Sequence, residues 1–293
     1  MALQLPSEPT GRPERLLAVC VHWDDCSVAL GNRDGVVSEV WSLQPDRAAQ
    51  GGAEAAPLAS RDALLLLDRL LVRTGTSLTD VEGLCFAKGP GAFTALRVAA
   101  GLVQGLALTL SKPVAGICSL AAMVAQDPAW QLPVAADGAA PGTAPAGEPP
   151  GPSWLQFSAI DARMGECYFA VHECRPGSHP QAVRPPAVGK PADVVSAFDQ
   201  VLTRRASEHA GIISAAAGNA FRLSPILARW AHESGLDPTD AAARSPTAAA
   251  VLAVAASAGA PAGGPARQAL PVYVRDKIAL DVAEQRAQAS SRT

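Results

Sequence analysis

Apolar residues along the chain fall into short runs separated by turn residues, and these runs predict alternating strands and helices. The predicted strands are Leu16–Val21, Cys26–Asn32, Val36–Leu43, Leu84–Ala87, Val114–Ile117, Leu155–Ile160, Cys167–Glu173 and Gly211–Ala216. The predicted helices are Arg61–Val72, Ala95–Leu110, Ala192–Arg205, Leu223–Glu233 and Pro246–Ala258. Mixed strands and helices in this order indicate an α/β protein.

A stretch rich in Pro, Gly and Ala interrupts this pattern between 127 and 152. It shows no period, which is typical of a linker or a long insertion. We therefore expect a first lobe at 15–126 and a second lobe at 153–283, with tails at 1–14 and 284–293. Each half begins with a strand hairpin and continues into helices.

Composition and charge restrict the function classes. The chain has 293 residues, of which 48% are apolar, so it can bury one large core or two modest ones. Its net charge of −3 provides no basic field for holding a phosphate backbone, so we expect no stable nucleic-acid binding by this chain alone.

The sequence also predicts a cytoplasmic protein without a membrane span. Residues 1–15 are polar and contain proline, unlike a secretory signal. The apolar stretches near 98–110 and 248–258 are too short, or too rich in glycine and alanine, to cross a bilayer. The six cysteines lie in apolar runs without disulfide or zinc spacing, so we expect buried thiols in a reducing compartment.

The most informative segment is a glycine-rich turn between a predicted strand and a predicted helix. Gly89 and Gly91 allow a sharp turn that exposes backbone N–H groups near a helix N-terminus, and we expect Thr94 to cap that helix. The spacing is neither that of a P-loop nor that of a dinucleotide fingerprint. A plain connecting turn is the alternative. The predicted partner- or ligand-facing turn consists of Lys88, Gly89, Pro90, Gly91, Ala92, Phe93, Thr94 and Arg97.

Four phrases in order resemble the TsaB family. The first is Cys26-Ser-Val-Ala-Leu30, and the second is the turn followed by Leu96-Arg97, Gly101, Gln104 and Gly105. The third is Ile160-Asp-Ala-Arg-Met-Gly-Glu-Cys-Tyr168, and the fourth is Pro271-Val-Tyr-Val-Arg275 near the end. Members of that family take part in threonylcarbamoyladenosine synthesis on tRNA.

The resemblance implies a two-lobed actin-like, Hsp70-like, sugar-kinase (ASKHA) fold. It also implies a non-catalytic subunit that dimerises with the catalytic subunit TsaD and activates it. In such a complex the small ATPase TsaE joins the pair, a separate enzyme supplies threonylcarbamoyl-adenylate, and tRNA is contacted only through the assembly.

The helices of the first lobe carry a candidate interface. Arg61–Val72 is rich in leucine beyond the stripe of about 100° that one core face requires, and the next helix presents small residues that allow close helix approach. The alternative is a helix buried entirely within its own lobe, and a self-associating homodimer could use the same surface. The predicted interface residues are Leu64, Leu67, Leu71, Gly101, Gln104 and Gly105.

The sequence contains no pattern that predicts a catalytic site, a metal site or a cofactor. The five histidines contain no pair four residues apart, and no Gly-x-Ser-x-Gly elbow occurs. Cys20-Val21-His22 stands where the family usually has Asp-Thr, so the first turn supplies neither a carboxylate for hydrated magnesium nor a hydroxyl for phosphate. These features disfavour the enzyme alternatives, a sugar-kinase-like phosphotransferase or a peptidase.

The best remaining polar cluster lies in the second-lobe hairpin. This hairpin occupies the place of the second phosphate loop of actin-like folds, and Gly218-Asn219 is a candidate third turn facing the cleft. Arg163 and Glu166 could pair across the hairpin or reach a partner. The cluster consists of Asp161, Arg163, Gly165 and Glu166.

Overall fold

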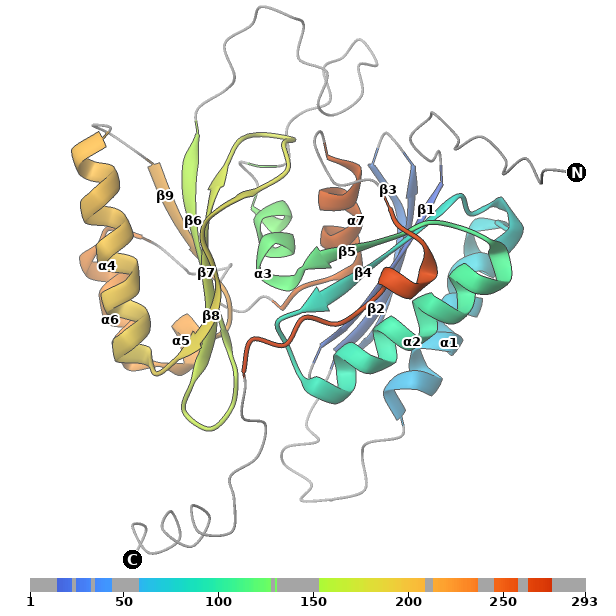
Figure 1. The fold of residues 1–293 in the computed structure, drawn as a ribbon, viewed down its shortest axis with the longest axis horizontal. Helices are drawn as coiled ribbons and strands as arrows, with labels where there is room; N and C mark the ends of the chain where they lie inside the picture. Colours follow the sequence, from blue (N-terminus) through green and yellow to red (C-terminus); the bar gives the residue numbers. More distant parts are fainter. Residues whose placement is uncertain are drawn as a thin grey trace, which may run out of the picture.

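The computed structural model divides into two lobes, each built on one β-sheet (Figure 1). It describes residues 15–22, 25–32, 35–43, 58–127, 130, 153–208, 213–236, 245–257 and 263–275. The predicted tails at 1–14 and 284–293, and nearly all of the predicted insertion at 127–152, lie outside the described residues. The two-lobed α/β architecture expected from the sequence is confirmed.

The first sheet has five strands in the order β3-β2-β1-β4-β5. An antiparallel meander is formed by β1 (Leu16–His22), β2 (Asp25–Asn32) and β3 (Gly35–Leu43), and β4 (Gly83–Gly89) and β5 (Val114–Cys118) add to it in parallel. All seven residues of β1 are buried, because this strand lies in the middle of the sheet and is covered on both faces.

Side chains of the first sheet alternate between two apolar layers. Leu17 and Val19 pack with α1 (Leu58–Thr74) and α2 (Phe93–Leu110) on one face. The smaller Ala18 and Cys20 point to the other face, against α7 (Ala248–Ala256). The alternation of side chains with a period of two, which indicated the strands in the sequence, therefore also decides which helix each side chain contacts.

The second sheet has four strands in the order β8-β7-β6-β9. The strands are β6 (Trp154–Asp161), β7 (Cys167–Cys174), β8 (Gln181–Gly189) and β9 (Ile213–Ala217). The helices α4 (Pro191–Glu208) and α6 (Pro225–Glu233) cover its outer face, and the short α5 (Ala220–Leu223) leads into α6. Phe157 lies 5.1 Å from Phe198 and 5.4 Å from Trp230, ring centroid to ring centroid, so aromatic edge-to-face contacts hold this layer together.

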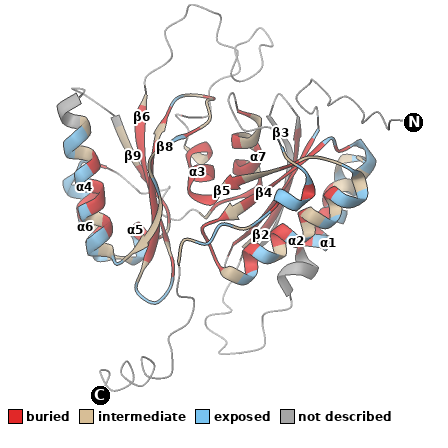
Figure 2. Cartoon of the chain, viewed as in Figure 1, coloured by how far each residue is buried: buried red, intermediate tan, exposed pale blue. Residues whose placement is uncertain are grey.

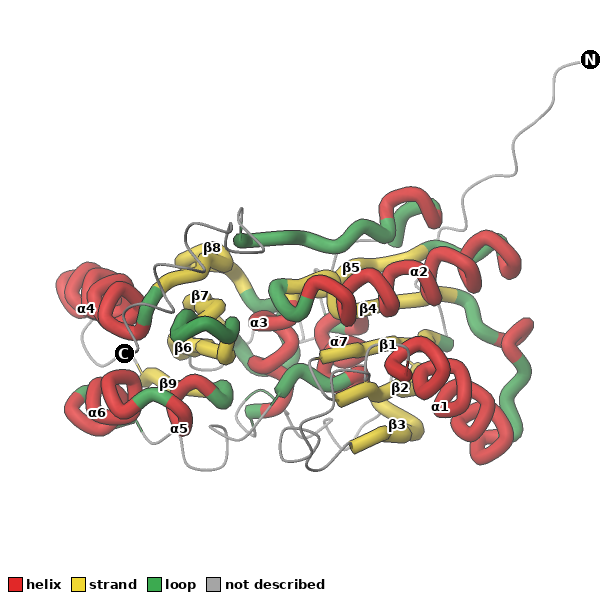
Figure 3. Tube along the Cα trace, turned by 90° about the horizontal axis from the view of Figure 1, so that it is seen from below, coloured by secondary structure: helices red, strands yellow, loops and turns green. Residues whose placement is uncertain are grey.

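The inner face of the second sheet lies against the first lobe through α3 (Ser119–Ala122) (Figure 3). Leu120 and Met123 pack with Ile160, Tyr168 and Ala170 in one buried cluster. Figure 2 shows that residues facing the opposite lobe are mainly buried, whereas the outer faces of α1, α2 and α4 carry the exposed positions.

Two features differ from the sequence prediction. The expected second lobe, 153–283, extends too far, because α7 and residues 263–269 pack against the first sheet and α2. β8 was not predicted, because Pro185 and Pro186 interrupt its pattern. Proline is tolerated there because β8 is an edge strand that pairs with β7 alone.

One described helix, α2, is long and apolar enough to cross a membrane by length and composition. In this fold α2 lies along the first sheet and buries Ala95, Leu96, Ala99, Ala100, Val103 and Ala107.

The backbone of Gly218 lies so close to the backbone of Ala159 that one added methyl group should strongly destabilise the fold. Gly218 has a φ of 120°, and a Cβ there would lie 1.9 Å from the carbonyl oxygen of Ala159. We expect Gly218→Ala to lower the free energy of unfolding by at least about 3 kcal/mol, measured by urea denaturation. The matched control is Gly101→Ala in α2, where a Cβ would meet nothing within 4 Å. It should stabilise by about 0.5–1 kcal/mol, and equal effects of the two changes would contradict this reading.

Candidate functional site

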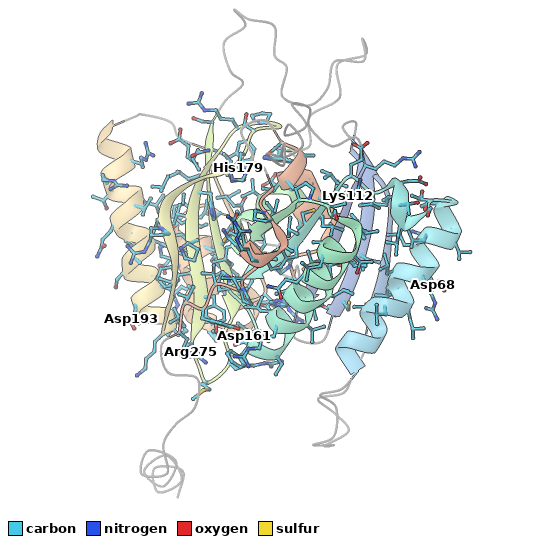
Figure 4. The ribbon with its side chains drawn as sticks, turned by 45° about the vertical axis from the view of Figure 1, so that its right-hand side comes forward. Asp68, Lys112, Asp161, His179, Asp193 and Arg275 are labelled. Atoms are coloured by element: carbon cyan, nitrogen blue, oxygen red, sulfur yellow. The ribbon has the colours of Figure 1, made fainter. Side chains whose placement is uncertain are left out.

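Three of the family-like phrases meet where the lobes face each other. These are the turn after β4, the hairpin between β6 and β7, and a C-terminal strap, defined here as residues 263–275. The strap pairs with the edge of β5 through Val114 and Gly264, follows α2, and ends beside the second-lobe hairpin (Figure 1). Figure 4 shows Asp161 of the hairpin and Arg275 of the strap in the same region.

Gly89 is required because the strap crosses directly over it. The residue has a φ of 117°, and a Cβ there would lie 2.6 Å from the carbonyl oxygen of Val272. The backbone N–H of Val272 donates to the carbonyl oxygen of Lys88 at 2.7 Å. The peptide bond between Gly89 and Pro90 is cis. Position 89 therefore requires glycine, because the strap leaves no room for a side chain there.

The predicted helix cap at Thr94 is wrong. α2 begins at Phe93, two residues before the predicted start at Ala95, and its N-cap is Ala92, which makes no side-chain hydrogen bond to the helix. Thr94 is therefore an exposed residue of the first turn. The first turn of α2 has no side chain capping its N–H groups.

The strap is held on the N-terminal end of α2 by a layered contact. The guanidinium of Arg97 lies 3.8 Å from the centre of the Phe93 ring, and its Nε donates to the Tyr273 hydroxyl at 3.2 Å. The Phe93 and Tyr273 rings are 5.0 Å apart, centroid to centroid. Further along α2, Gln104 Nε2 donates to the carbonyl oxygen of Ala269 at 2.9 Å.

The second-lobe hairpin has an unusual backbone that is fixed by hydrogen bonds. Arg163, Met164 and Gly165 have φ values of 62°, 58° and 75°. The Asp161 carboxylate accepts from the Arg163 backbone N–H at 2.9 Å, and Asn219 Oδ1 accepts from the Asp161 N–H at 2.8 Å. The turn at Gly218-Asn219 therefore stabilises the hairpin through the hydrogen bond of Asn219 to the Asp161 backbone.

Arg163 and Glu166 each pair with another residue rather than with each other across the hairpin. Arg163 pairs with Asp161, with a nitrogen–oxygen distance of 3.5 Å. Glu166 instead forms an ion pair with Arg275 of the strap, and Arg275 also lies 3.7 Å from the Met164 sulfur. The strap thus connects α2 of the first lobe with the hairpin of the second.

A cavity of about 350 Å³ lies between these parts. The turn contributes Gly91, Ala92, Phe93 and Thr94, the hairpin and β7 contribute Ala162, Arg163, Met164 and Tyr168, and the strap contributes Val272, Tyr273, Val274 and Arg275. Gly91, Ala92, Phe93, Thr94 and Arg163 were predicted as site residues. Tyr168, Tyr273 and Arg275 were present in the matching phrases, but nothing in the sequence indicated that they line a common cavity.

At the end of β1, in the part of this region that the structure describes, Cys20 and Val21 supply neither a carboxylate for magnesium nor a hydroxyl for phosphate. The Cys20 thiol donates to the carbonyl oxygen of Pro246 at 3.2 Å, so it is engaged by the segment that leads into α7. His22 is buried behind Gly91, whose Cβ position lies 3.8 Å from His22 Nδ1. Among the residues that the structure describes, no group of three or more His, Cys, Asp or Glu side chains could hold a metal ion.

The six cysteines are free thiols, and five of them are buried, as expected from their apolar surroundings. Burial raises the pKa of the Cys85 thiol to about 12. The Cys85 thiol therefore remains protonated at neutral pH and acts as a packing residue rather than a nucleophile.

The predicted interface residues fall into different environments. Leu64 has 54% of its surface exposed, whereas Leu67 is buried in the first-lobe core and Leu71 is half-buried against it. Gly101 and Gly105 face open space, and Gln104 holds the strap. The interface prediction for Leu67 is therefore wrong, because this leucine lies on the side of α1 that faces the sheet. The exposed apolar residues that sequence analysis missed on these helices are Leu65, Val72 and Leu108.

Comparison with known proteins gives consistent similarities. The family model described as TsaD, tRNA N6-adenosine threonylcarbamoyltransferase, matches residues 47–139. The tRNA threonylcarbamoyladenosine biosynthesis protein TsaB of Escherichia coli (strain K12) is 30% identical over 266 residues, covering 90% of this chain and 96% of the relative. A crystal structure described as an uncharacterized protein with similarity to peptidase YEAZ from Pseudomonas aeruginosa is 27% identical. It has a TM-score of 0.60 and covers 89% of this chain and 100% of that chain.

Two buried histidines predict a loss of stability in acid. Burial, and secondarily the charge of Arg163, lowers the pKa of His22 from 6.5 to about 4. Burial, and secondarily His179, lowers the pKa of His172 on β7 to about 4. Because the unfolded chain takes up these protons near pH 6.5 and the folded chain does not, stability is complete above pH 6.5 and falls as the pH drops toward 4. The expected loss is about 3 kcal/mol for each histidine.

Urea denaturation at pH 7 and at pH 4.5 measures this loss. His172→Gln, which cannot titrate, should flatten the pH dependence, whereas the exposed His232→Gln on α6 should leave it unchanged. An unaltered slope in His172→Gln would show that His172 does not contribute.

Proposed function

The chain belongs to the TsaB family, and from that membership together with the open face of α1 and α2 we propose that it is a non-catalytic subunit of the machinery that makes threonylcarbamoyladenosine on tRNA. It pairs through the first lobe with a TsaD-like catalytic subunit and holds that subunit in its active arrangement. The transfer of the threonylcarbamoyl group to the adenosine beside the anticodon is then the partner's chemistry. A TsaE-like ATPase joins the pair, and tRNA is contacted through the assembled complex.

The observation that carries this proposal is the exposed face of α1 and α2. On α2, Gly101 and Gly105 lie one turn apart, and a Cβ at either position would meet nothing within 4 Å. Leu108 continues this stripe with 72% of its surface exposed. On the neighbouring α1, Leu64, Leu65 and Val72 are 54%, 46% and 76% exposed.

Glycine in the middle of a helix normally costs stability, so two on an exposed face need another reason. Each destabilises the helix by about 1 kcal/mol relative to alanine. A flat, small-residue strip flanked by exposed leucines and valine suits the close approach of another helix, whose side chains would fill the strip. This is the kind of surface that pairing with a related two-lobed subunit would use.

Two functions other than an accessory subunit remain as alternatives, a homodimer and an enzyme. A homodimer could bury the same face through a two-fold axis. An actin-like-fold enzyme, either a sugar-kinase-like phosphotransferase or a peptidase, would need catalytic groups in the cleft. In the described residues of that region, β1 ends in Cys20, Val21 and His22, and the Cys20 thiol donates a hydrogen bond to the carbonyl oxygen of Pro246. That arrangement supports the accessory role over an enzyme that acts alone.

A substitution that stabilises the chain but blocks its interface gives the sharpest test of pairing. Gly101→Leu places a side chain into open space on α2, so the isolated chain should gain about 0.7 kcal/mol in unfolding free energy through helix propensity. The same side chain should fill the strip and weaken binding to the TsaD-like subunit by at least tenfold, measured by calorimetry.

The control is Gln200→Leu, an exposed position on α4 of the second lobe. It should leave binding unchanged. If Gly101→Leu binds the catalytic subunit as tightly as the unaltered chain, the α2 face is not the interface. Light scattering with and without the partner separates a homodimer from a heterodimer.

Reconstitution tests the functional role directly. Catalytic subunit, ATPase and adenylate-forming enzyme are mixed with tRNA, with and without this chain, and threonylcarbamoyladenosine is measured by mass spectrometry. Product should form only when the chain is present, and Gly101→Leu should reduce it. Product formation that is independent of the chain would sink the accessory-subunit proposal.

A further inference from the structure

The cavity between the lobes has a chemistry that the accessory role does not explain. Its walls come from the turn, the hairpin and the strap, so both lobes contribute to it. A volume of about 350 Å³ falls at the small end of the range of ligand sites, roughly 300–1,000 Å³. The residues that line it divide into a polar end and an aromatic wall.

The polar end contains donors that lack protein acceptors. α2 is an 18-residue helix whose N-cap, Ala92, offers no side-chain oxygen, so the N–H groups of its first turn have no side-chain cap. The end of such a helix attracts a negative charge. Thr94, exposed in that first turn, adds a hydroxyl to the same wall.

A second observation at this site is the hydroxyl of Tyr168. The residue is only 7% exposed and lines the cavity, yet none of the described residues forms a hydrogen bond with its hydroxyl. The hydroxyl oxygen itself is not fully buried, so it remains accessible from the cavity, where it can form a hydrogen bond with a bound group.

Charges around the cavity limit how negative a ligand can be. Arg163 supplies a guanidinium, paired with Asp161 at 3.5 Å, and Arg275 is engaged by Glu166. Each arginine is accompanied by a carboxylate, so the local field is only weakly positive. Such a site suits one compact oxyanion rather than a chain of phosphates.

The remaining walls are flat and apolar. The ring centroids of Phe93 and Tyr273 lie 5.0 Å apart, Met164 contributes a thioether from the hairpin, and Val272 and Val274 complete the lining from the strap. Aromatic rings and a thioether favour contact with a planar group.

We propose that this cavity binds a small molecule that carries a single carboxylate or phosphate on a flat ring. The oxyanion lies at the N-terminus of α2, within reach of Arg163 and the Tyr168 hydroxyl, and the ring lies against Phe93, Met164 and Tyr273. Because the strap and the hairpin both contact the ligand, binding joins the two lobes and holds the strap on α2.

Titration calorimetry on the full chain with three probes tests the site. Phenyl phosphate has both the ring and the oxyanion, inorganic phosphate has only the oxyanion, and phenol has only the ring. Phenyl phosphate should bind at least tenfold more tightly than either of the others. Benzoate distinguishes a carboxylate from a phosphate as the preferred oxyanion.

Two variants locate the binding. Tyr168→Phe and Arg163→Gln each remove a donor to the anion and should weaken phenyl phosphate binding about tenfold, as expected for a hydrogen bond to a charged group. Arg229→Gln, an exposed change on α6 in the second lobe, is the matched control and should have no effect. Thermal unfolding of each variant verifies that the fold is retained.

Failure would take one of two forms. Absence of phenyl phosphate binding at 10 mM would overturn the proposal, as would binding that Tyr168→Phe and Arg163→Gln leave unchanged. These measurements use the chain alone, so they are independent of whether it pairs with a catalytic subunit. Loss of pairing in Gly101→Leu would leave the cavity chemistry unaltered.

Discussion

The crossing of the C-terminal strap over the turn after β4 is the contact on which the arrangement of this molecule depends. The Val272 N–H donates to the Lys88 carbonyl at 2.7 Å, and the Gly89 Cα lies so near the strap that no side chain fits. From this crossing the strap reaches Arg97 and Phe93 on one side and Glu166 on the other. One backbone approach therefore fixes α2, the cavity and the hairpin relative to each other.

The strap also explains why the chain order and the lobes do not coincide. α7 covers the face of the first sheet that presents small residues such as Ala18 and Cys20, and the strap then covers the edge of β5. Without this return, the sheet would expose an apolar face and a strand edge to water. The first lobe is therefore completed by segments that follow the whole second lobe in sequence.

The candidate interface and the cavity share one helix. α2 presents Gly101, Gly105 and Leu108 outward, while its uncapped N-terminus and Phe93 border the cavity. Arg97 lies between these regions and contacts Tyr273 of the strap. A partner on the α2 face and a ligand at its N-terminus would thus act on the same rigid element, which gives a physical route by which one could influence the other.

The sequence by itself determined the α/β class, most strands and helices, the division into two halves and the segments that form the site. Period-two runs such as Leu17, Val19 and Val21 are local signals, and Gly89 and Gly218 mark turns that only glycine allows. Only the tertiary structure decided that Leu67 is buried, that Thr94 does not cap α2, and that Tyr168, Tyr273 and Arg275 meet in one cavity. The cavity depends on segments as far apart in the chain as Phe93 and Tyr273, and local periodicity carries no information about contacts at that distance.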